Sequence, residues 1–426
     1  MSNRRDFLKK LGKITTAGIA LGWTAPGLGE AGLSAQDPVL INSAGDEIWS
    51  VVQSSFHMND DLIYMNNGTL GPSPALVEEA ITEHIRKVNT NLRYGGGESV
   101  REDIAEFINA DKTEISLTHN TTEGINVATW GIPMKKRDEV IITSQEHVGN
   151  AMPWLNRAAH DGIIVKTFWP ALTKNEVLNQ INDLITKRTR VISIPHISCT
   201  IGQRFPVKEV CQLARDKGIL TVIDGAHGAG AIELDMQDIQ PDIYATCGHK
   251  WLLGPKGTGF LYVRKDVMDL VKPVFAGAYT DKGFDITVNP PTFDGYGPTA
   301  HRYDYGTQNA ALRIGVSAAI DFHTQIGRSK VEERVTGLNE YLFGQLRELG
   351  SIEIISSPEK GSRSMMLGFR HKKVDYMELF QILWKDRIRV RVVPEANLNS
   401  IRVSTHVYNS EKHVDLLVEA LKQLEN

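Results

Sequence analysis

The chain has 426 residues, of which 41% are hydrophobic and 23% are charged, and this length suffices for one large α/β domain and a smaller one. Its formal net charge of −4 provides no basic field for a nucleic acid, so we expect no nucleic-acid partner. Three scattered cysteines and the lack of an HExxH pattern give no support for a disulfide framework or a metal site.

The N-terminus carries Arg4 and Arg5, followed by Phe7, Leu8 and a weakly apolar stretch dotted with glycines. This pattern resembles a twin-arginine export signal, and a basic amphipathic helix is the alternative. The apolar stretch is shorter than the roughly 20 residues that cross a bilayer, so we expect no stable membrane anchor. The pattern therefore predicts a signal peptide over residues 1–35 and export of the folded protein to the periplasm.

After an N-terminal segment over residues 36–63, short β-rich runs alternate with helical patterns as far as residue 263. Clustered apolar and β-branched residues predict strands at 139–144, 163–168, 190–197, 219–225 and 259–264. Apolar recurrence near 3.6 residues, ending at glycine, predicts helices at 121–131, 150–162 and 206–218. This alternation predicts an α/β fold with a mostly parallel sheet, helices on both faces, and ligands at the carboxyl ends of the strands.

The remainder of the chain changes character at about residue 272. Residues 272–305 are rich in Gly, Pro, Tyr and Asp and predict an extended functional loop. Two consecutive helical patterns and a run of short strands and helices follow, which predict a small α+β domain. We therefore divide the chain into a large domain over residues 64–310 and a part with linking helices and a small C-terminal domain over residues 311–426.

Two chemically distinctive residues follow predicted strands. Asp224 ends the run TVID before a glycine-rich turn, and Lys250 follows the next strand-like run 26 residues later. Pyridoxal phosphate (PLP) needs both types of residue: a lysine amine bonds to its aldehyde, and an acid keeps its pyridine nitrogen protonated. Thr121 and Thr122 open a predicted helix whose N-terminus can hold a phosphate. A turn-capping role for Asp224 and ordinary N-capping by the threonines are the alternatives.

Motifs from YMNNGTLGPSP at Tyr64 to IRVSTHVYNSEKHVDLL near the C-terminus match a known family in order and spacing. The chain resembles the class V aminotransferases among the fold-type I PLP enzymes, and in particular the isopenicillin N epimerase-like branch. The resemblance implies a large domain with a mostly parallel seven-stranded sheet, a small C-terminal α+β domain, and PLP as the cofactor.

The resemblance also implies roles for individual residues around the cofactor. Lys250 would form the covalent bond to PLP, and His249 would approach its phosphate. Asp224 would pair with the pyridine nitrogen, and His227 would lie near the ring hydroxyl. His147 would stack on the face of the pyridine ring, a contact that suits a planar side chain.

Three further residues are implied to serve the substrate and a second subunit. Arg402 matches the arginine that binds the substrate α-carboxylate, for which a guanidinium has suitable geometry. Asn67 is expected to contact the substrate as well. Thr307 matches a threonine that reaches the phosphate in the neighbouring subunit, which implies a homodimer with shared active sites.

The chain departs from the cysteine desulfurases of this family at three places. The stretch VVPEANLNSIR lacks the mobile nucleophilic cysteine, so we expect no persulfide-forming desulfurase activity. Cys247 stands where many members have a serine, and a thiol is the poorer donor to a phosphate. Cys199 stands where desulfurases have an asparagine, and we assign neither cysteine a catalytic role.

These observations predict a PLP enzyme that epimerises or transaminates the α-carbon of an amino acid or an amino-terminated peptide. A PLP-dependent C–S lyase, or an enzyme that tailors siderophore peptides of the pyoverdine type in the periplasm, is the alternative. Two hypotheses come from other classes. GPKGTG is similar to a nucleotide-binding loop but lacks the pattern GxxxxGK[ST], which disfavours nucleotide hydrolysis. A non-catalytic exported binding protein would not need Lys250.

Overall fold

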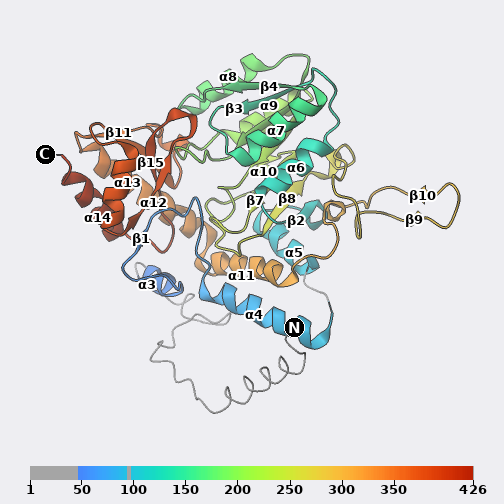
Figure 1. Cartoon of the computed structure of the whole chain (residues 1–426), viewed down its shortest axis with the longest axis horizontal. Helices are drawn as coiled ribbons and strands as arrows, with labels where there is room; N and C mark the ends of the chain where they lie inside the picture. Colours follow the sequence, from blue (N-terminus) through green and yellow to red (C-terminus); the bar gives the residue numbers. More distant parts are fainter. Residues whose placement is uncertain (1–46, 94–96, 426) are drawn as a thin grey trace, which may run out of the picture. The chain divides into compact units, whose positions relative to one another are not determined.

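A computed structural model describes residues 47–93 and 97–425, all of which belong to one compact unit (Figure 1). The predicted signal peptide over residues 1–35 lies outside the described residues. No helix in the described ranges is long and apolar enough to span a membrane. The proposed domain boundary near residue 310 stays a prediction.

A seven-stranded sheet forms the centre of the larger part, with the strand order β2-β8-β7-β6-β5-β3-β4. Only β8 runs antiparallel to its neighbours, so the predicted mostly parallel sheet and α/β fold class are confirmed. The strands are β2 (Ile115–Thr118), β3 (Glu139–Thr143), β4 (Ile164–Phe168), β5 (Thr189–Pro195), β6 (Leu220–Asp224), β7 (Ile243–Cys247) and β8 (Gly259–Val263).

Both faces of this sheet are buried, because alternate strand residues enter two separate hydrophobic cores. On β3, for example, Val140 and Ile142 belong to one core and Ile141 to the other. Helices α6 (Thr121–Gly131) and α7 (Val148–Asp161) cover the first face. The opposite face packs against α5 (Gly97–Phe107), α8 (Lys174–Leu184), α9 (Val207–Asp216) and α11 (Ala310–Ile326).

A smaller antiparallel sheet lies in the C-terminal part, with the order β11-β12-β15-β14. Its strands are β11 (Ile352–Ile354), β12 (Met366–His371), β14 (Arg391–Val393) and β15 (Ser400–Ser404), and its core includes residues of α12 (Arg328–Arg347), α13 (Tyr376–Lys385) and α14 (Glu411–Lys422). Strand β1 (Ile63–Tyr64) pairs with β13 (Ile388–Arg389), so the start of the predicted large domain is hydrogen-bonded to the C-terminal part.

Shorter elements connect these layers. The predicted extended loop at 272–305 contains the hairpin of β9 (Phe284–Asp285) and β10 (Thr292–Phe293), which projects away from the seven-stranded sheet (Figure 1). The remaining helices are α3 (Glu47–Ser54), α4 (Ala75–Asn91), α10 (Met236–Ile239), and the 3-10 turns η1 (Lys112–Glu114), η2 (Lys265–Val267), η3 (Ala300–Tyr303), η4 (Lys360–Ser362) and η5 (Glu395–Asn397).

Candidate active site

A cavity of about 170 Å³ lies at the carboxyl ends of the parallel strands. Four strand ends contribute to it, because the segments after β2, β3, β6 and β7 all emerge at this edge of the sheet. The residues that line it are Thr69, Asn120, Thr121, Thr122, His147, Gly149, Asp224, Ala226, Cys247, His249 and Lys250. Six of the ten predicted site residues are thus brought together, although they span 130 positions of the sequence, from Thr121 to Lys250.

One end of the cavity offers hydrogen-bond donors. Asn120 caps α6, and its side chain accepts from the backbone N–H of Glu123 at 3.0 Å. The first turn of the helix therefore begins at Thr121 and faces the cavity with N–H groups that have no intrahelical acceptor. Thr121 Oγ1 and His249 Nδ1 are buried, and neither has a hydrogen-bond partner among the described residues. This arrangement can hold an anion.

The same cavity also carries a carboxylate. Asp224 is the last residue of β6 and is 5% exposed, and its Oδ1 accepts from the backbone N–H of Ala226 at 2.9 Å. Glu146 lies nearby, and burial, with a smaller contribution from Asp224, raises the pKa of Glu146 to about 8. Glu146 is therefore mostly protonated at neutral pH, which leaves Asp224 as the carboxylate that can meet a cationic ring nitrogen.

Lys250 lies in this cavity and is 9% exposed. Its Nζ is 3.4 Å from Nε2 of His227, whose Nδ1 accepts a hydrogen bond from the indole N–H of Trp251 at 3.0 Å. Burial, and then the charge of Lys250, lower the pKa of His227 well below its usual value. The histidine is consequently neutral when it faces the lysine.

His147 is the N-cap of α7, and its Nδ1 accepts from the backbone N–H of Gly149 at 3.0 Å. This cap explains why α7 begins at Val148 and not at the predicted residue 150. Partial burial, and then the charge of Lys250, lower the pKa of His147, so its ring tends to be neutral. A neutral imidazole that shares a cavity with Asp224 and Lys250 is in a suitable position to pack against a planar ring.

The two cysteines near the site are buried thiols. Cys247 lines the cavity, its Sγ lies 3.7 Å from the carbonyl oxygen of Ala226, and burial raises its pKa. Burial also raises the pKa of Cys199 to about 11. Both thiols therefore remain protonated at neutral pH, and protonated thiols are poor nucleophiles.

Arg402 lies behind the cavity on β15 and is 1% exposed. Its Nη1 donates to the carbonyl oxygen of Cys199, and its Nη2 donates to Asn66 Oδ1 at 3.2 Å and to Thr69 Oγ1 at 3.1 Å. Its Nε is buried and has no hydrogen-bond partner among the described residues. Burial, and then the charge of Arg391, lower the pKa of Arg402 to about 9. Arg402 thus reaches the cavity through Thr69 and keeps one free donor.

Arg391 is a second arginine, next to Arg402, and it is not among the site residues predicted from the sequence. It is the cross-strand partner of Arg402, and its guanidinium forms an ion pair with Glu395 in η5. The charge of Arg391 lowers the pKa of His147, and the charge of Glu395 raises it, as smaller contributions after burial and Lys250. The run IRVRVV contains the only available signal, since Arg391 interrupts an apolar strand.

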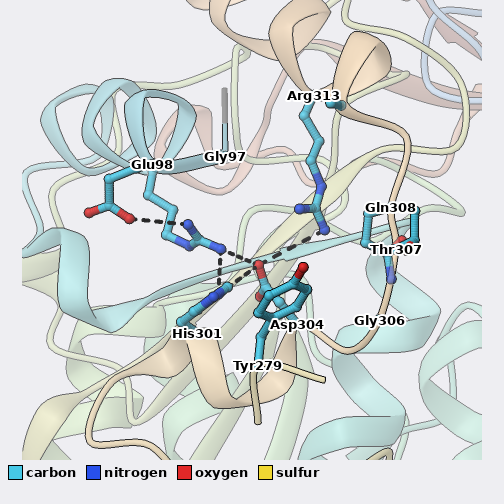
Figure 2. Close-up of a pocket in the computed structure, with 11 residues that line it drawn as sticks. Gly97, Glu98, Tyr279, His301, Asp304, Gly306, Thr307, Gln308 and Arg313 are labelled. Atoms are coloured by element: carbon cyan, nitrogen blue, oxygen red, sulfur yellow. Dashed lines mark hydrogen bonds and ion pairs between the residues drawn. The ribbon is translucent and has the colours of Figure 1, made fainter. Parts of the chain in front are cut away.

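Four predicted site residues do not line the cavity: His227 and Arg402, whose contacts are given above, and Asn67 and Thr307. Asn67 is fully buried, its Oδ1 accepts from the hydroxyl of Tyr408 at 3.0 Å, and its Nδ2 has no partner among the described residues. Thr307 lines a different cavity of about 350 Å³, shown in Figure 2, beside an ion-pair network centred on Asp304. Thr307 therefore does not face Lys250 of its own chain.

The residues present fit PLP at both of its ends. The phosphate requires donors and the start of a helix, which Thr121, Thr122 and His249 supply. The protonated pyridine nitrogen requires the carboxylate of Asp224, and the aldehyde requires an amine such as that of Lys250. A mostly parallel sheet that presents this set at its strand ends defines a fold-type I PLP enzyme.

The chain belongs to the class-V aminotransferase family, because residues 87–417 match the family model described as "Aminotransferase class-V". It is 30% identical over 389 residues to a probable cysteine desulfurase of Methanothermobacter thermautotrophicus, which covers 85% of this chain and 95% of the relative. It is 28% identical over 391 residues to an isopenicillin N epimerase of Amycolatopsis lactamdurans, which covers 88% of this chain and 98% of the relative.

Solved structures have the same fold. A cysteine desulfurase from Thermococcus onnurineus NA1 matches with a TM-score of 0.78 at 25% identity and covers 88% of this chain and 97% of its own. The cystine C-S lyase C-DES, solved with its reaction product cysteine persulfide, matches with a TM-score of 0.78 at 24% identity and covers 85% of this chain and 97% of its own. The predicted PLP-dependent fold is thereby confirmed.

The comparisons correct two predictions. The expected epimerisation or transamination is wrong, because relatives from several organisms are named cysteine desulfurases, and the structural neighbours include a C–S lyase. The exclusion of a persulfide-forming desulfurase is wrong on the same findings. That exclusion depended on one loop without a cysteine, whereas the electron sink for breaking the bond belongs to the cofactor and not to that loop.

Proposed function

We propose that this protein is a PLP-dependent enzyme that cleaves the C–S bond of cysteine or of a cysteine derivative. The observation that carries the proposal is the likeness over 85% of the chain to a relative named a probable cysteine desulfurase. The cavity supports it, since Lys250 lines the same cavity as the donors at the start of α6 and the Asp224 carboxylate.

PLP supplies an electron sink for the substrate α-carbon when it is bound. Asp224 holds a proton on the ring nitrogen by its negative charge. Lys250 Nζ moves protons at the substrate α-carbon, as a base and then as an acid. Thr121, Thr122 and His249 bind the phosphate, and His147 restricts the ring to one orientation.

Arg402 and Arg391 orient the substrate. Arg402 Nε and Arg391 Nη1 are buried and have no hydrogen-bond partner among the described residues, so both can donate to a substrate carboxylate. When its carboxylate is held there, the substrate directs its α-carbon and its thiol-bearing side chain toward Lys250.

A homodimer with shared sites is part of the proposal. Thr307 supports it, because this residue lines a cavity separate from that of Lys250 (Figure 2), as a residue that serves the neighbouring subunit would. The hairpin also exposes Phe284, Ile286 and Phe293, apolar side chains that a second copy could cover. Light scattering tests the mass, and mixed dimers of the Lys250→Ala and Thr307→Ala chains should regain activity that neither variant has alone.

Export by the twin-arginine route completes the proposal and is supported by the sequence near Arg4 and Arg5. A change of both arginines to lysine should retain the protein in the cytoplasm. Cell fractionation measures this, and an unchanged distribution would contradict it.

The reaction is tested with PLP-loaded protein and L-cysteine or L-cystine, by measuring sulfide and persulfide together with alanine and pyruvate. We expect sulfur release with wild type and with Lys256→Ala, whose lysine lies in the exposed turn next to the site. Lys250→Ala should release none. Turnover of amino acids to keto acids or D-isomers without sulfur release would overturn the proposal.

A further inference from the structure

We infer that Trp251 is a positioning residue that holds His227 in the neutral Nε2–H tautomer, so that this ring donates toward Lys250 Nζ. The inference concerns the lysine that binds the cofactor and does not depend on which substrate is used. It can therefore stand or fall separately from the proposed C–S cleavage.

The tautomer follows from the chemistry of the donor. An indole nitrogen carries a hydrogen and accepts nothing, so the contact of 3.0 Å between Trp251 Nε1 and His227 Nδ1 requires a lone pair on Nδ1. In a neutral imidazole the proton must then be on Nε2. This is the nitrogen that lies 3.4 Å from Lys250 Nζ.

The doubly protonated form of His227 is disfavoured on two grounds. A proton on Nδ1 would face the indole N–H directly, and the ring is only 3% exposed. The charged or titratable groups that influence it besides Lys250 are Arg402, His147 and Arg391, and all of them lower its pKa. The ring therefore acts as a fixed donor at Nε2, and of the two forms of Lys250 only the unprotonated amine can accept from it.

Trp251 is itself held in place by the C-terminal part of the chain. It is fully buried and stacks on His406 with ring centroids 5.5 Å apart and planes 22° apart. The backbone N–H of Val407 donates to His406 Nδ1 at 2.7 Å, so His406 also carries its proton on Nε2, which donates to the carbonyl oxygen of Trp251 at 2.8 Å.

The hydrogen bonds thus form a series with one direction, from Val407 through His406, Trp251 and His227 to Lys250. The tautomer of each histidine is fixed by a donor that cannot reverse, the backbone N–H of Val407 for His406 and the indole N–H of Trp251 for His227. The series is a positioning device and not a proton path, because Trp251 takes part through two separate groups, its carbonyl oxygen and its indole nitrogen. Its consequence is that the Lys250 amine meets a donor, which favours the lone pair that reacts with the cofactor aldehyde.

The first test is nitrogen NMR of the cofactor-free protein with ¹⁵N-labelled histidine, in which His227→Gln assigns the signals that belong to His227. We expect Nδ1 of His227 to be unprotonated and Nε2 protonated in wild type. In Trp251→Phe, which keeps an aromatic ring but loses the N–H, we expect a mixture of tautomers. Trp154→Phe is the matched control, because Trp154 is equally buried but its Nε1 has no partner among the described residues.

The second test is the pH profile of the rate at which added PLP develops its lysine-dependent visible absorbance. Trp251→Phe should raise the pH midpoint by about one unit, the shift that corresponds to one hydrogen bond. It should cause no further shift in a His227→Gln background, and Trp154→Phe should cause none.

A wild-type His227 that is protonated on Nδ1 would overturn the inference, even if Trp251→Phe failed to fold. Unchanged His227 signals in a folded Trp251→Phe protein would overturn it as well. If no absorbance develops with PLP, the cofactor site is refuted, and the NMR result still decides the tautomer.

Discussion

The Lys250 site has a cofactor end, formed by Asp224, His147 and the start of α6, and a substrate end, formed by Arg402, Arg391 and the loop after β14. The two ends differ in how firmly their backbone is fixed. At the cofactor end, Asp224 ends strand β6, His147 and the start of α6 follow strands β3 and β2, and the caps and turns there are hydrogen-bonded. At the substrate end, the loop after β14 places Ala396, Asn397 and Asn399 at positive φ angles of 53°, 55° and 43°. Such conformations cost free energy in residues other than glycine and cluster at functional segments.

This difference suggests a division of work between a preformed cofactor site and an adaptable substrate site. The ion pair of Arg391 and Glu395 belongs to the adaptable end, and Arg391 Nη1 and Glu395 Oε2 are both buried without a partner among the described residues. A substrate carboxylate would compete with Glu395 for Arg391. Changes at the cofactor end should therefore reduce turnover, whereas changes at the substrate end should alter KM.

The largest effect should come from Asp224→Asn. A neutral amide cannot balance a protonated ring nitrogen, so we expect kcat to fall about a hundredfold or more while the visible absorbance of bound PLP persists. Steady-state kinetics and absorbance measure the two quantities. Asp216→Asn is the control at an exposed site. A near-normal kcat in Asp224→Asn would contradict the proposed role of the Asp224 carboxylate.

Arg402→Lys should have the next largest effect. A lysine cannot reproduce a guanidinium that donates to Cys199, Asn66 and Thr69 together, so the group that orients the substrate would be displaced. We expect KM to rise about 10- to 100-fold, with a smaller change in kcat. Thermal unfolding should be measured alongside, because the substitution also leaves buried acceptors unsatisfied. A fall in kcat alone would break the distinction between the two ends.

The sequence predicts the cofactor end well because it depends on local patterns. Asp224 and Lys250 each follow a strand that its own residues identify, and parallel strands bring their carboxyl ends to one edge of the sheet. Thr121 and His147 are found by similar reasoning, from the start of a helix and from a family motif. The link from Trp251 to His227 escapes such reasoning, since it depends on the packing of two side chains 24 residues apart.

The substrate end is predicted less completely for a physical reason. Whether Arg391 faces solvent or the cavity depends on its pairing with Arg402 on β15, a register that only the folded sheet sets. Similarly, Asn66 contacts Arg402, whereas the predicted Asn67 contacts Tyr408, because neighbouring residues in an extended segment point to opposite sides. The prediction of the reaction was wrong at this same end, because it depended on a single loop.

Glu395→Gln should lower KM, the opposite of the effect expected for Arg402→Lys. Removal of the charge weakens the ion pair and frees Arg391 for a substrate carboxylate, so we expect KM to fall about three- to tenfold at an unchanged kcat. Glu353→Gln, at an exposed position on β11, is the matched control for the loss of one negative charge. A raised KM would show that Glu395 contacts the substrate favourably, and the loop would then belong to a preformed site.

The smallest expected effect is at the cofactor end, in Cys247→Ser. The thiol of Cys247 is buried in the cavity, and its Sγ lies 3.7 Å from the carbonyl oxygen of Ala226. A hydroxyl is the stronger donor, so serine should slow the dissociation of PLP by about two- to fivefold, as one weak hydrogen bond would. Cys211→Ser, at a buried position away from the cavity, is the control, and dialysis followed by absorbance measures retention.

Because burial raises the pKa of the Cys247 thiol, the difference in PLP dissociation between wild type and Cys247→Ser should not vary between pH 6 and pH 8, where the thiol stays protonated. A difference that grows toward pH 8 would mean that Cys247 ionises in the loaded site, and the cofactor end would then be less firmly preformed than its hydrogen bonds indicate.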